Sequence, residues 1–241
     1  MGNNIINNVG FISGFGPLVR GAKFVNAFSG NTSGTVDIYT CPAGKKALIT
    51  QVMGISSPIM TGGLQLKISG NYYNFTPPNT IWGNVSTNSF GIVINPGEGL
   101  SFTVNSNPGG NLWARIMEMD ISTPIYTARL LSLAAGDNTI FTVGAGKTAI
   151  TLDTLGGAYV NGSGGIYKNF SGASRSIKVY HVPNGGSSGT ANQYFQNTAV
   201  ANSSGVVVPS VPASMNSGDS IVINTDASTA TQWVYMTYYE I

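Results

Sequence analysis

Hydrophobic and polar residues alternate in short runs along this chain of 241 residues, and clusters of glycine, proline and asparagine separate the runs. In "GLSFTVNS" (99–106), Leu100 and Phe102 alternate with polar residues, and "SIVINT" (220–225) repeats the pattern with Ile221 and Ile223. Because successive side chains of a β-strand point to opposite faces, a period of two predicts strands with these four residues in the core. Many short strands bounded by turn residues indicate an all-β protein of the sandwich type.

The same succession of patterns occurs twice. "VDIYTCPAGKKALITQVMGIS" (36–56) aligns with "NTIFTVGAGKTAITLDTLGGA" (138–158), and each contains an extended run, a glycine turn with a lysine, and a second apolar run. Later matches in the same order pair Gly97 with Gly218, Glu98 with Asp219 and Glu118 with Glu240. The offset between the copies grows along the chain, which predicts an insertion of about twenty residues within 159–205, since insertions collect in loops.

This duplication predicts two tandem β-sandwich domains of a jelly-roll-like kind with an extended N-terminal arm. We expect the arm at 1–34, the first sandwich at 35–121, a linker at 122–137 and the second sandwich, with longer loops, at 138–241. The arm has no evident counterpart before the second copy, yet it is too apolar for a plain disordered tail. It either orders against another subunit or adds a strand or cover to its own domain.

Trp113 and Trp233 lie near the start of the last predicted strand of each copy. Large aromatic side chains in such strands bury extensive apolar surface. We therefore expect both to be buried against the facing sheet.

Charge is scarce in this sequence. Asp, Glu, Lys and Arg make up 8% of residues and the formal net charge is +2, against roughly 25% charged residues in an average soluble domain. A nucleic-acid partner is not expected, because phosphate binding needs clustered basic residues. Nothing approaches 18 consecutive apolar residues, so no membrane contact is expected either. The single cysteine, Cys41, excludes an intramolecular disulfide and multi-cysteine zinc sites.

The stretch "GAGKT" (144–148) looks like the end of a phosphate-binding loop. The position of the first glycine in that motif is Phe141, and a β-branched run follows where the motif requires a helix. Its counterpart Gly44-Lys45-Lys46 lacks the hydroxyl residue. We therefore interpret the stretch as a turn between two strands, with no cofactor.

No set of residues for catalysis or metal binding emerges from the sequence. His181 is the only histidine, and nothing in the sequence pairs it with Cys41 as a nucleophile and base. The carboxylates Glu98 and Asp219 fall at matching turn positions, which favours a shared structural role over two active sites. We expect no catalytic residue and no metal site, and hence a protein that is not an enzyme.

Aromatic residues outside the predicted core are candidates for assembly interfaces. "GNYYNFTPPNTIWGN" (70–84) gathers several of them in a loop-like stretch that contains proline. Aromatic rings beside amides suit protein interfaces and also sugars, and we favour the protein interface. The candidate residues are Phe11, Phe15, Arg20, Phe24, Phe28, Tyr72, Tyr73, Phe75 and Trp82.

The segments "YTCPAGKKALITQVMGIS" with "INPGEGLSFTV", and "FTVGAGKTAITLDTLG" with "MNSGDSIVI", resemble turn and strand signatures in the jelly rolls of accessory virion proteins of tailed bacteriophages. These include capsid decoration or cement, head-fibre and tail proteins. The likeness runs from residue 35 onward and rests on short turns, and Gly144 replaces the proline in the second copy.

The resemblance implies a non-enzymatic structural protein of the virion, assembled in the host cytoplasm. It implies a homotrimer that binds a major capsid or tail protein and presents its second domain outward. The alternative is a host-recognition or glycan-binding module of a phage tail or head fibre, with a host surface glycan as its partner.

Overall fold

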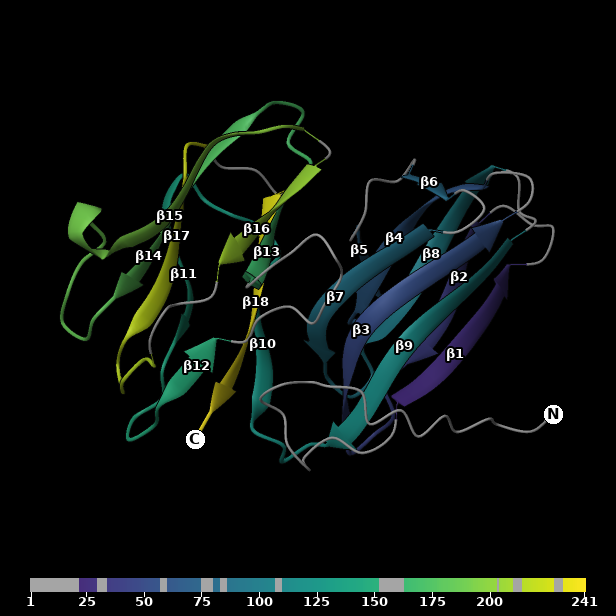
Figure 1. Cartoon of the computed structure of the whole chain (residues 1–241), viewed down its shortest axis with the longest axis horizontal. Coiled ribbons are helices and arrows are strands. Elements are labelled where there is room, and N and C mark those ends of the chain that lie inside the picture. Colours follow the sequence, from purple (N-terminus) through teal and green to yellow (C-terminus); the bar gives the residue numbers. More distant parts are fainter. Residues whose placement is uncertain are drawn as a thin grey trace. The chain divides into compact units, whose positions relative to one another are not determined.

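The computed structural model describes most of the chain. The described residues are 22–29, 34–56, 60–74, 80–82, 86–106, 110–151, 163–202, 204–209, 214–227 and 232–241. Contacts between residues divide them into two compact units, of which the first ends at Thr123 and the second begins at Pro124. Each unit consists of two antiparallel sheets, so the predicted all-β fold is confirmed (Figure 1).

The first unit contains sheets 1a and 1b. Sheet 1a has the strand order β1 (Ala22–Ser29), β9 (Gly110–Asp120), β3 (Lys45–Ser56), β7 (Ser86–Ile94). Sheet 1b has the order β2 (Gly34–Thr40), β8 (Gly99–Ser106), β4 (Met60–Ile68), β5 (Asn71–Asn74), and β6 (Thr80–Trp82) also pairs with β4.

The second unit repeats this order in sheets 2a and 2b. Sheet 2a runs β10 (Ile125–Leu130), β18 (Gln232–Glu240), β13 (Ser163–Asn169), β16 (Ser204–Pro209), with β12 (Ala149–Thr151) also on β18. Sheet 2b runs β11 (Gly136–Thr142), β17 (Ser220–Thr225), β14 (Arg175–Val182), β15 (Gln193–Val200). In both units the last strand lies beside the first, and the chain crosses between the two sheets except at the hairpins β4–β5 and β14–β15 and at the short strands β6 and β12, which is the jelly-roll arrangement.

The two units agree in strand register as well as in strand order. Ala47 of β3 lies opposite Glu118 of β9, and Ala149 of β12 lies opposite Glu240 of β18, as the sequence repeat requires. The pairing of β2 with β8 shifts between Asp37 and Tyr39, and that of β11 with β17 shifts at the matching place. Since a slip of one residue would turn every side chain to the other face, this agreement shows a duplication at the level of single residues.

The first strand of each unit lies outside the boundaries expected from sequence. Residues 22–29, within the expected arm 1–34, form β1 and pair with β9. Residues 125–130, within the expected linker 122–137, form β10 and pair with β18. The sequence alignment of the two copies did not include these strands. They occupy the same edge position in sheets 1a and 2a, but their sequences have little in common.

The insertion in the second copy also begins earlier than expected. The continuous strand β3 corresponds to two strands, β12 and β13, which both pair with β18. Val52 of β3 lies opposite Ala114, and Gly165 of β13 lies opposite the equivalent Met236. Part of the insertion therefore lies between residues 151 and 163, at a position where strand β3 of the first copy is continuous. The rest lies in the later loops.

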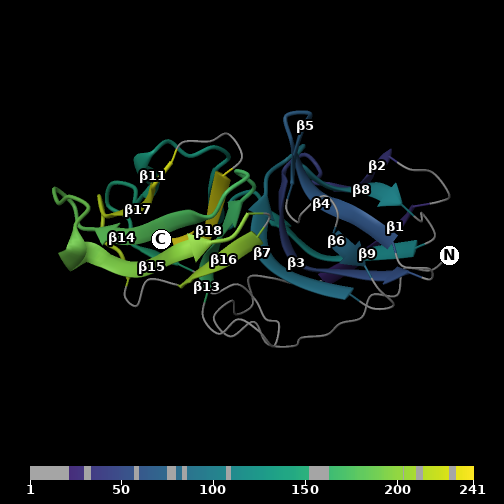
Figure 2. The same ribbon diagram turned by 90° about the horizontal axis from the view of Figure 1, so that it is seen from above.

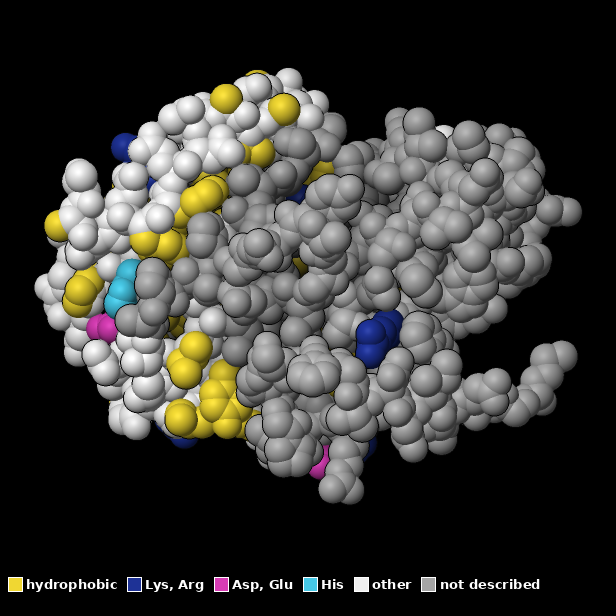
Figure 3. Space-filling model, in the orientation of Figure 1, with side chains coloured by type: hydrophobic (Ala, Val, Ile, Leu, Met, Phe, Trp, Pro, Cys, Tyr) yellow, Lys and Arg dark blue, Asp and Glu magenta, His cyan; other side chains and the backbone are white. Residues whose placement is uncertain are grey.

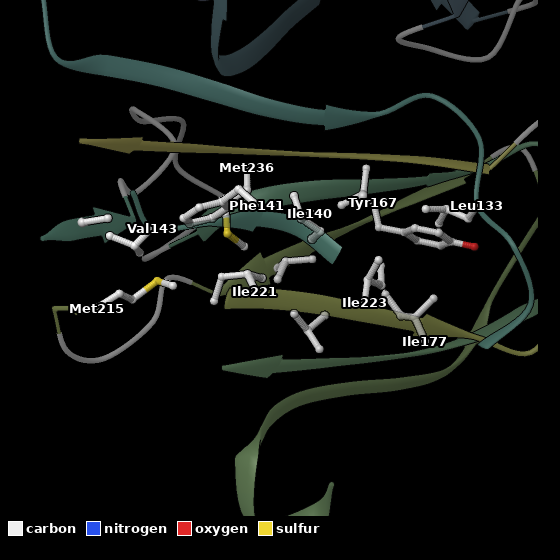
Figure 4. Close-up of a cluster of buried hydrophobic side chains, with 14 of the residues drawn as sticks. Leu133, Ile140, Phe141, Val143, Tyr167, Ile177, Met215, Ile221, Ile223 and Met236 are labelled. Atoms are coloured by element: carbon white, nitrogen blue, oxygen red, sulfur yellow. The ribbon is translucent and has the colours of Figure 1, made fainter. Parts of the chain in front are cut away.

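Each unit has its own apolar core between its two sheets. In the second unit, Tyr167 and Met236 of sheet 2a meet Ile177, Ile221 and Ile223 of sheet 2b (Figure 4). In the first unit, the equivalent positions of β8 hold Leu100 and Phe102, each 1% exposed. The four core residues expected from the alternating pattern are therefore buried as predicted.

Trp233 is buried, as expected, but not against the facing sheet. It alternates along β18 with Val234, which belongs to the core, so its side chain lies on the opposite face of sheet 2a. There its ring stacks on Tyr235, with the two centroids 5.9 Å apart. The side chain of Trp113 lies outside the described part of the structure, although its backbone belongs to β9.

The "GAGKT" stretch forms a turn between β11 and β12. Gly146 has a φ of 71° and its counterpart Gly44 has a φ of 73°, a left-handed conformation that favours glycine. The N–H of Val143 donates to the carbonyl of Asp219, and the N–H of Cys41 donates to the carbonyl of Glu98, both at 2.8 Å. A strand and not a helix follows Lys147, so the geometry of a phosphate-binding loop is not formed here.

Candidate functional site

Most of the aromatic candidates lie where the structure gives no side-chain position. Phe11, Phe15, Arg20 and Phe75 fall outside the described residues. Phe24 and Phe28 belong to β1, and Trp82 belongs to β6, but only their backbone is described. The proposed interface role of these seven residues therefore stays a prediction.

Tyr72 and Tyr73 lie on β5, at the end of a tight hairpin with β4. The two turn residues Ser69 and Gly70 have φ values of 50° and 81°, as in the turns that match the twist of paired strands. Tyr72 lies opposite Lys67, whereas Tyr73 lies opposite the buried Leu66. The two tyrosines therefore point to opposite faces of sheet 1b, and only Tyr72 reaches the outer face. Strand β5, which carries both, is the edge strand of this sheet beside β4 (Figure 2).

The outer face of sheet 1b carries an array of polar side chains from four strands. We call it the polar face. Its residues are Thr35 and Asp37 of β2, Ser101 and Thr103 of β8, Gln65 and Lys67 of β4, and Tyr72 and Asn74 of β5.

An ion pair and an aromatic ring make up the first half of the polar face. The Lys67 Nζ lies 2.5 Å from the Asp37 Oδ2, and the Ser101 hydroxyl donates to the Asp37 Oδ1 at 2.7 Å. The same Nζ lies 5.5 Å from the centroid of the Tyr72 ring, within the range of a cation–π contact. Hydrogen bonds from Lys67 and then from Ser101 hold the pKa of Asp37 below its usual value, so this carboxyl stays ionised at neutral pH.

Hydroxyl and amide groups form the second half as a continuous chain. The hydroxyls of Thr35 and Thr103 share a hydrogen bond of 2.8 Å, and Thr103 donates to the Gln65 Oε1 at 2.8 Å. The Gln65 Nε2 then donates to the Asn74 Oδ1 at 2.9 Å. Each bond restrains a side chain that would otherwise rotate, so donors and acceptors stand in fixed places across the sheet.

The equivalent face of sheet 2b is apolar at its centre, although Asn224 and Asp137, at the places of Thr103 and Thr35, keep a hydrogen bond of 2.6 Å. Gln65 and Ser101 lie opposite each other in sheet 1b, and the corresponding pair in sheet 2b is Tyr180 and Val222. With Val182, these two residues form a separate buried cluster, which we call the apolar face. Burial, with a smaller contribution from Asp137, raises the pKa of Tyr180.

The connection between β14 and β15, residues 183–192, runs across this second face. It includes the short 3₁₀ helix η2 (Thr190–Asn192). The hydroxyl of Ser188 donates to Asp137 of β11, which is separated from β14 by β17. A segment fastened across the sheet in this way accounts for the burial of the apolar face, and we call it the strap.

His181 and Asp219 meet where the strap begins. The His181 Nε2 lies 3.0 Å from the Asp219 Oδ2, and the backbone N–H groups of Asn184 and Asn216 donate to the same carboxylate at 3.0 and 2.9 Å. Burial opposes ionisation of Asp219, but these three contacts outweigh it and the net pKa is lowered. Sequence reasoning matched Asp219 with Glu98 but had no signal for the histidine.

Cys41, the candidate nucleophile that the sequence analysis set aside, lies in the first unit, whereas His181 lies in the second. Its side chain is buried, and burial raises the pKa of the thiol. Within the described ranges, no three His, Cys, Asp or Glu side chains gather to hold a metal ion. In the same part of the chain, no helix is long and apolar enough to cross a membrane.

Comparison with known proteins gives fold likenesses only. Neither family models nor curated protein sequences yield a match. The chain resembles the major capsid protein P2 of bacteriophage PM2 with 11% identity over 91% of this chain and 97% of that chain, at a TM-score of 0.36. It resembles a protein in the structure of Sulfolobus turreted icosahedral virus with 14% identity over 90% of this chain and 59% of that chain, at 0.27.

A tandem CBM22 domain of Paenibacillus barcinonensis Xyn10C gives 8% identity over 92% of this chain and 84% of that chain, at a TM-score of 0.24. At TM-scores this low, none of these likenesses carries an inference about function.

Proposed function

We propose that this chain is a non-enzymatic structural protein of a virus particle that binds and stabilises the capsid, or attaches to head or tail, in the manner of a decoration or cement protein. The single observation that carries the proposal is the duplicated jelly roll, with the same strand order and register in both units. The turns that join these strands are those whose sequences resemble virion jelly rolls.

The composition of the surface supports a role in assembly. Only 8% of the residues are charged, and charged side chains are sparse among the coloured residues of the face in Figure 3. Low charge density gives little electrostatic repulsion between copies. Such a surface suits a protein that works packed against others.

The partners follow from the same resemblance. The chain assembles with its own copies as a homotrimer and binds another virion protein, such as a major capsid or tail protein, in particles formed in the host cytoplasm. Residues 1–34 and the first unit dock on the particle, and the second unit, which carries the strap, faces outward. The apolar residues of 1–21 contribute the docking contacts.

Particle incorporation tests this proposal. Full-length chain and a chain without residues 1–21, which keeps strand β1, are supplied to particles that lack the protein. The proposal predicts that the full chain co-purifies with particles and that the truncated chain does not. If the truncated chain is incorporated as fully as the parent chain, residues 1–21 have no docking role. If the full-length chain is never found in particles, the structural role is wrong.

The alternative function is a host-recognition or glycan-binding module. The observation that favours it is the exposed polar face with Tyr72 at its edge. A cell-adsorption assay with purified protein separates the two functions, because a module for host recognition binds host cells without the rest of the particle.

A further inference from the structure

We propose that the polar face of sheet 1b is a binding site for a neutral carbohydrate. This deepens the alternative function above and is independent of the role in the particle. The site consists of the Tyr72 ring, the Asp37–Lys67 pair and the Gln65–Asn74 amides.

The charge of the face selects the class of ligand. Asp37 and Lys67 neutralise each other at 2.5 Å, and the other members of the polar face are uncharged at neutral pH. A phosphate, a nucleic acid or an acidic sugar would need a positive excess that this face does not have. The hydroxyls of a neutral polyol can instead donate hydrogen bonds to Asp37 and accept them from Lys67, and the charge of the site stays neutral.

The aromatic ring supplies the apolar part of the contact. Tyr72 is 43% exposed, and the ammonium of Lys67 near its ring restrains it. Sugars carry C–H groups on one side and hydroxyls around the edge, so a ring beside fixed amides matches both parts. Because Gln65 and Asn74 already bond to each other, little side-chain entropy is lost when a ligand is bound.

The second unit provides an internal comparison. On the same scaffold, the equivalent positions hold Tyr180, Val182 and Val222, and the strap covers them. In the first unit the matching connection is the two-residue turn Ser69–Gly70, which is too short to reach across the sheet. The Thr35–Thr103 bond has a counterpart in Asp137–Asn224, whereas the places of Gln65 and Lys67 hold Tyr180 and Val182 in the second unit. The ion pair and the amide pair of the polar face are therefore features of the first unit and not requirements of the jelly roll.

The experiment is a glycan array with full-length chain, followed by titration of the best oligosaccharide. The array holds neutral glycans of glucose, galactose, mannose and N-acetylglucosamine, with sialylated and sulfated glycans as the acidic arm. We expect binding to neutral glycans, weakened about tenfold by Tyr72→Ala and retained by Tyr72→Phe, which keeps the ring. Gln65→Ala weakens binding independently of the ring.

Ile150→Ala is the matched control, because Ile150 is an exposed side chain of the second unit with 46% exposure. It leaves binding unchanged. No binding to neutral glycans, binding to the acidic arm alone, or binding that Tyr72→Ala does not weaken would each overturn the proposal. A change of native mass in Tyr72→Ala without glycan binding would assign the face to a protein interface. Because the docking contacts are assigned to 1–21, the carbohydrate proposal predicts that Tyr72→Ala enters particles as the parent chain does, in place of the interface role expected for Tyr72 from sequence. This test and that of the structural role therefore fail separately.

Discussion

The outer faces of sheets 1b and 2b differ in chemistry although the two sheets share their strand order, and the pairs β2–β8 and β11–β17 share their register. In the first unit, the buried Ser101 donates to Asp37, and the side chains of Asp37 and Tyr72 are exposed. In the second unit, Val222 takes the place of Ser101, and the strap lies over an apolar face. The inner faces of both sheets are apolar, because each must build a core.

This difference indicates which positions of the duplicated sandwich can change in residue type without loss of the fold. The inner side chains of β8 and β17 remain Leu100, Phe102, Ile221 and Ile223. The outer side chains changed together with the length of one connection, since an apolar face needs a cover and a polar face does not. Function is therefore expected on the faces that diverged.

The largest effect is expected when a charge is placed beneath the strap. Val222→Asp buries a carboxylate on the apolar face without a cationic partner from that cluster, and destabilises the second unit by about 3 kcal/mol. Ser101→Val at the equivalent position of the first unit costs about 1 kcal/mol, because it removes one hydrogen bond to Asp37. Denaturant unfolding with hydrogen exchange by mass spectrometry assigns each loss to its unit. Equal losses in the two units would refute the contrast between the faces.

A smaller difference is expected at the turns that carry the matched carboxylates. Gly218 and Gly97 have φ values of 85° and 79°, so alanine strains either turn by about 1 kcal/mol. A Cβ at Gly218 would also lie 2.5 Å from the Asn184 side chain, whereas nothing lies within 4 Å of one at Gly97. Gly218→Ala therefore lowers the melting temperature more than Gly97→Ala and raises hydrogen exchange in the strap. A larger loss for Gly97→Ala would contradict this packing.

Acid should weaken the second unit through Asp219. The pKa of this carboxyl is lowered in the folded state, so its contribution is complete above the unfolded pKa of about 3.9 and is lost as pH falls through the lower folded value. Asp219→Asn flattens the acid limb of stability against pH for the second unit. Asp37, whose side chain is 41% exposed, contributes less because solvent screens its ion pair. An unchanged acid limb in Asp219→Asn would rule out this role.

The smallest effect is expected at the two turn lysines. Lys147 is exposed, and Lys45 makes an ion pair with Asp120 whose side chains are 44% and 74% exposed. Pairs this exposed contribute little, so Lys45→Ala and Lys147→Ala leave the melting temperature unchanged within error. Nucleotide added to either variant or to the parent chain also leaves it unchanged. A rise in melting temperature that depends on Lys147 would reverse the interpretation of this turn.

The repeat was predictable wherever backbone geometry restricts the residue type. The turn glycines are present in both copies because the turns need a left-handed φ. A glutamate is present at the same position of the last strand in both copies, as Glu118 opposite Ala47 and Glu240 opposite Ala149. Strand β10 was missed, and β1 was foreseen only as one of two alternatives for the arm, because an edge strand pairs through its backbone and leaves its side chains free to differ. The sequence did not predict that β12 and β13 together replace β3, because the insertion between them interrupts the alternating pattern.

The candidate site was predictable only in part. Tyr72 stood out as an aromatic residue in a polar stretch, but its partners Lys67 and Asp37 lie on other strands, and only the pairing of β2, β8, β4 and β5 brings them together. His181 and Asp219 are 38 residues apart and likewise meet only through the fold. Contacts between strands distant in sequence leave no local pattern to detect.

Native mass spectrometry of the full chain, over a range of concentrations, tests the proposal of a self-assembling virion protein most directly. The account predicts a homotrimer, with three times the mass of one chain, which binds to particles that lack the protein. A chain that stays monomeric at every concentration and does not bind such particles would contradict it.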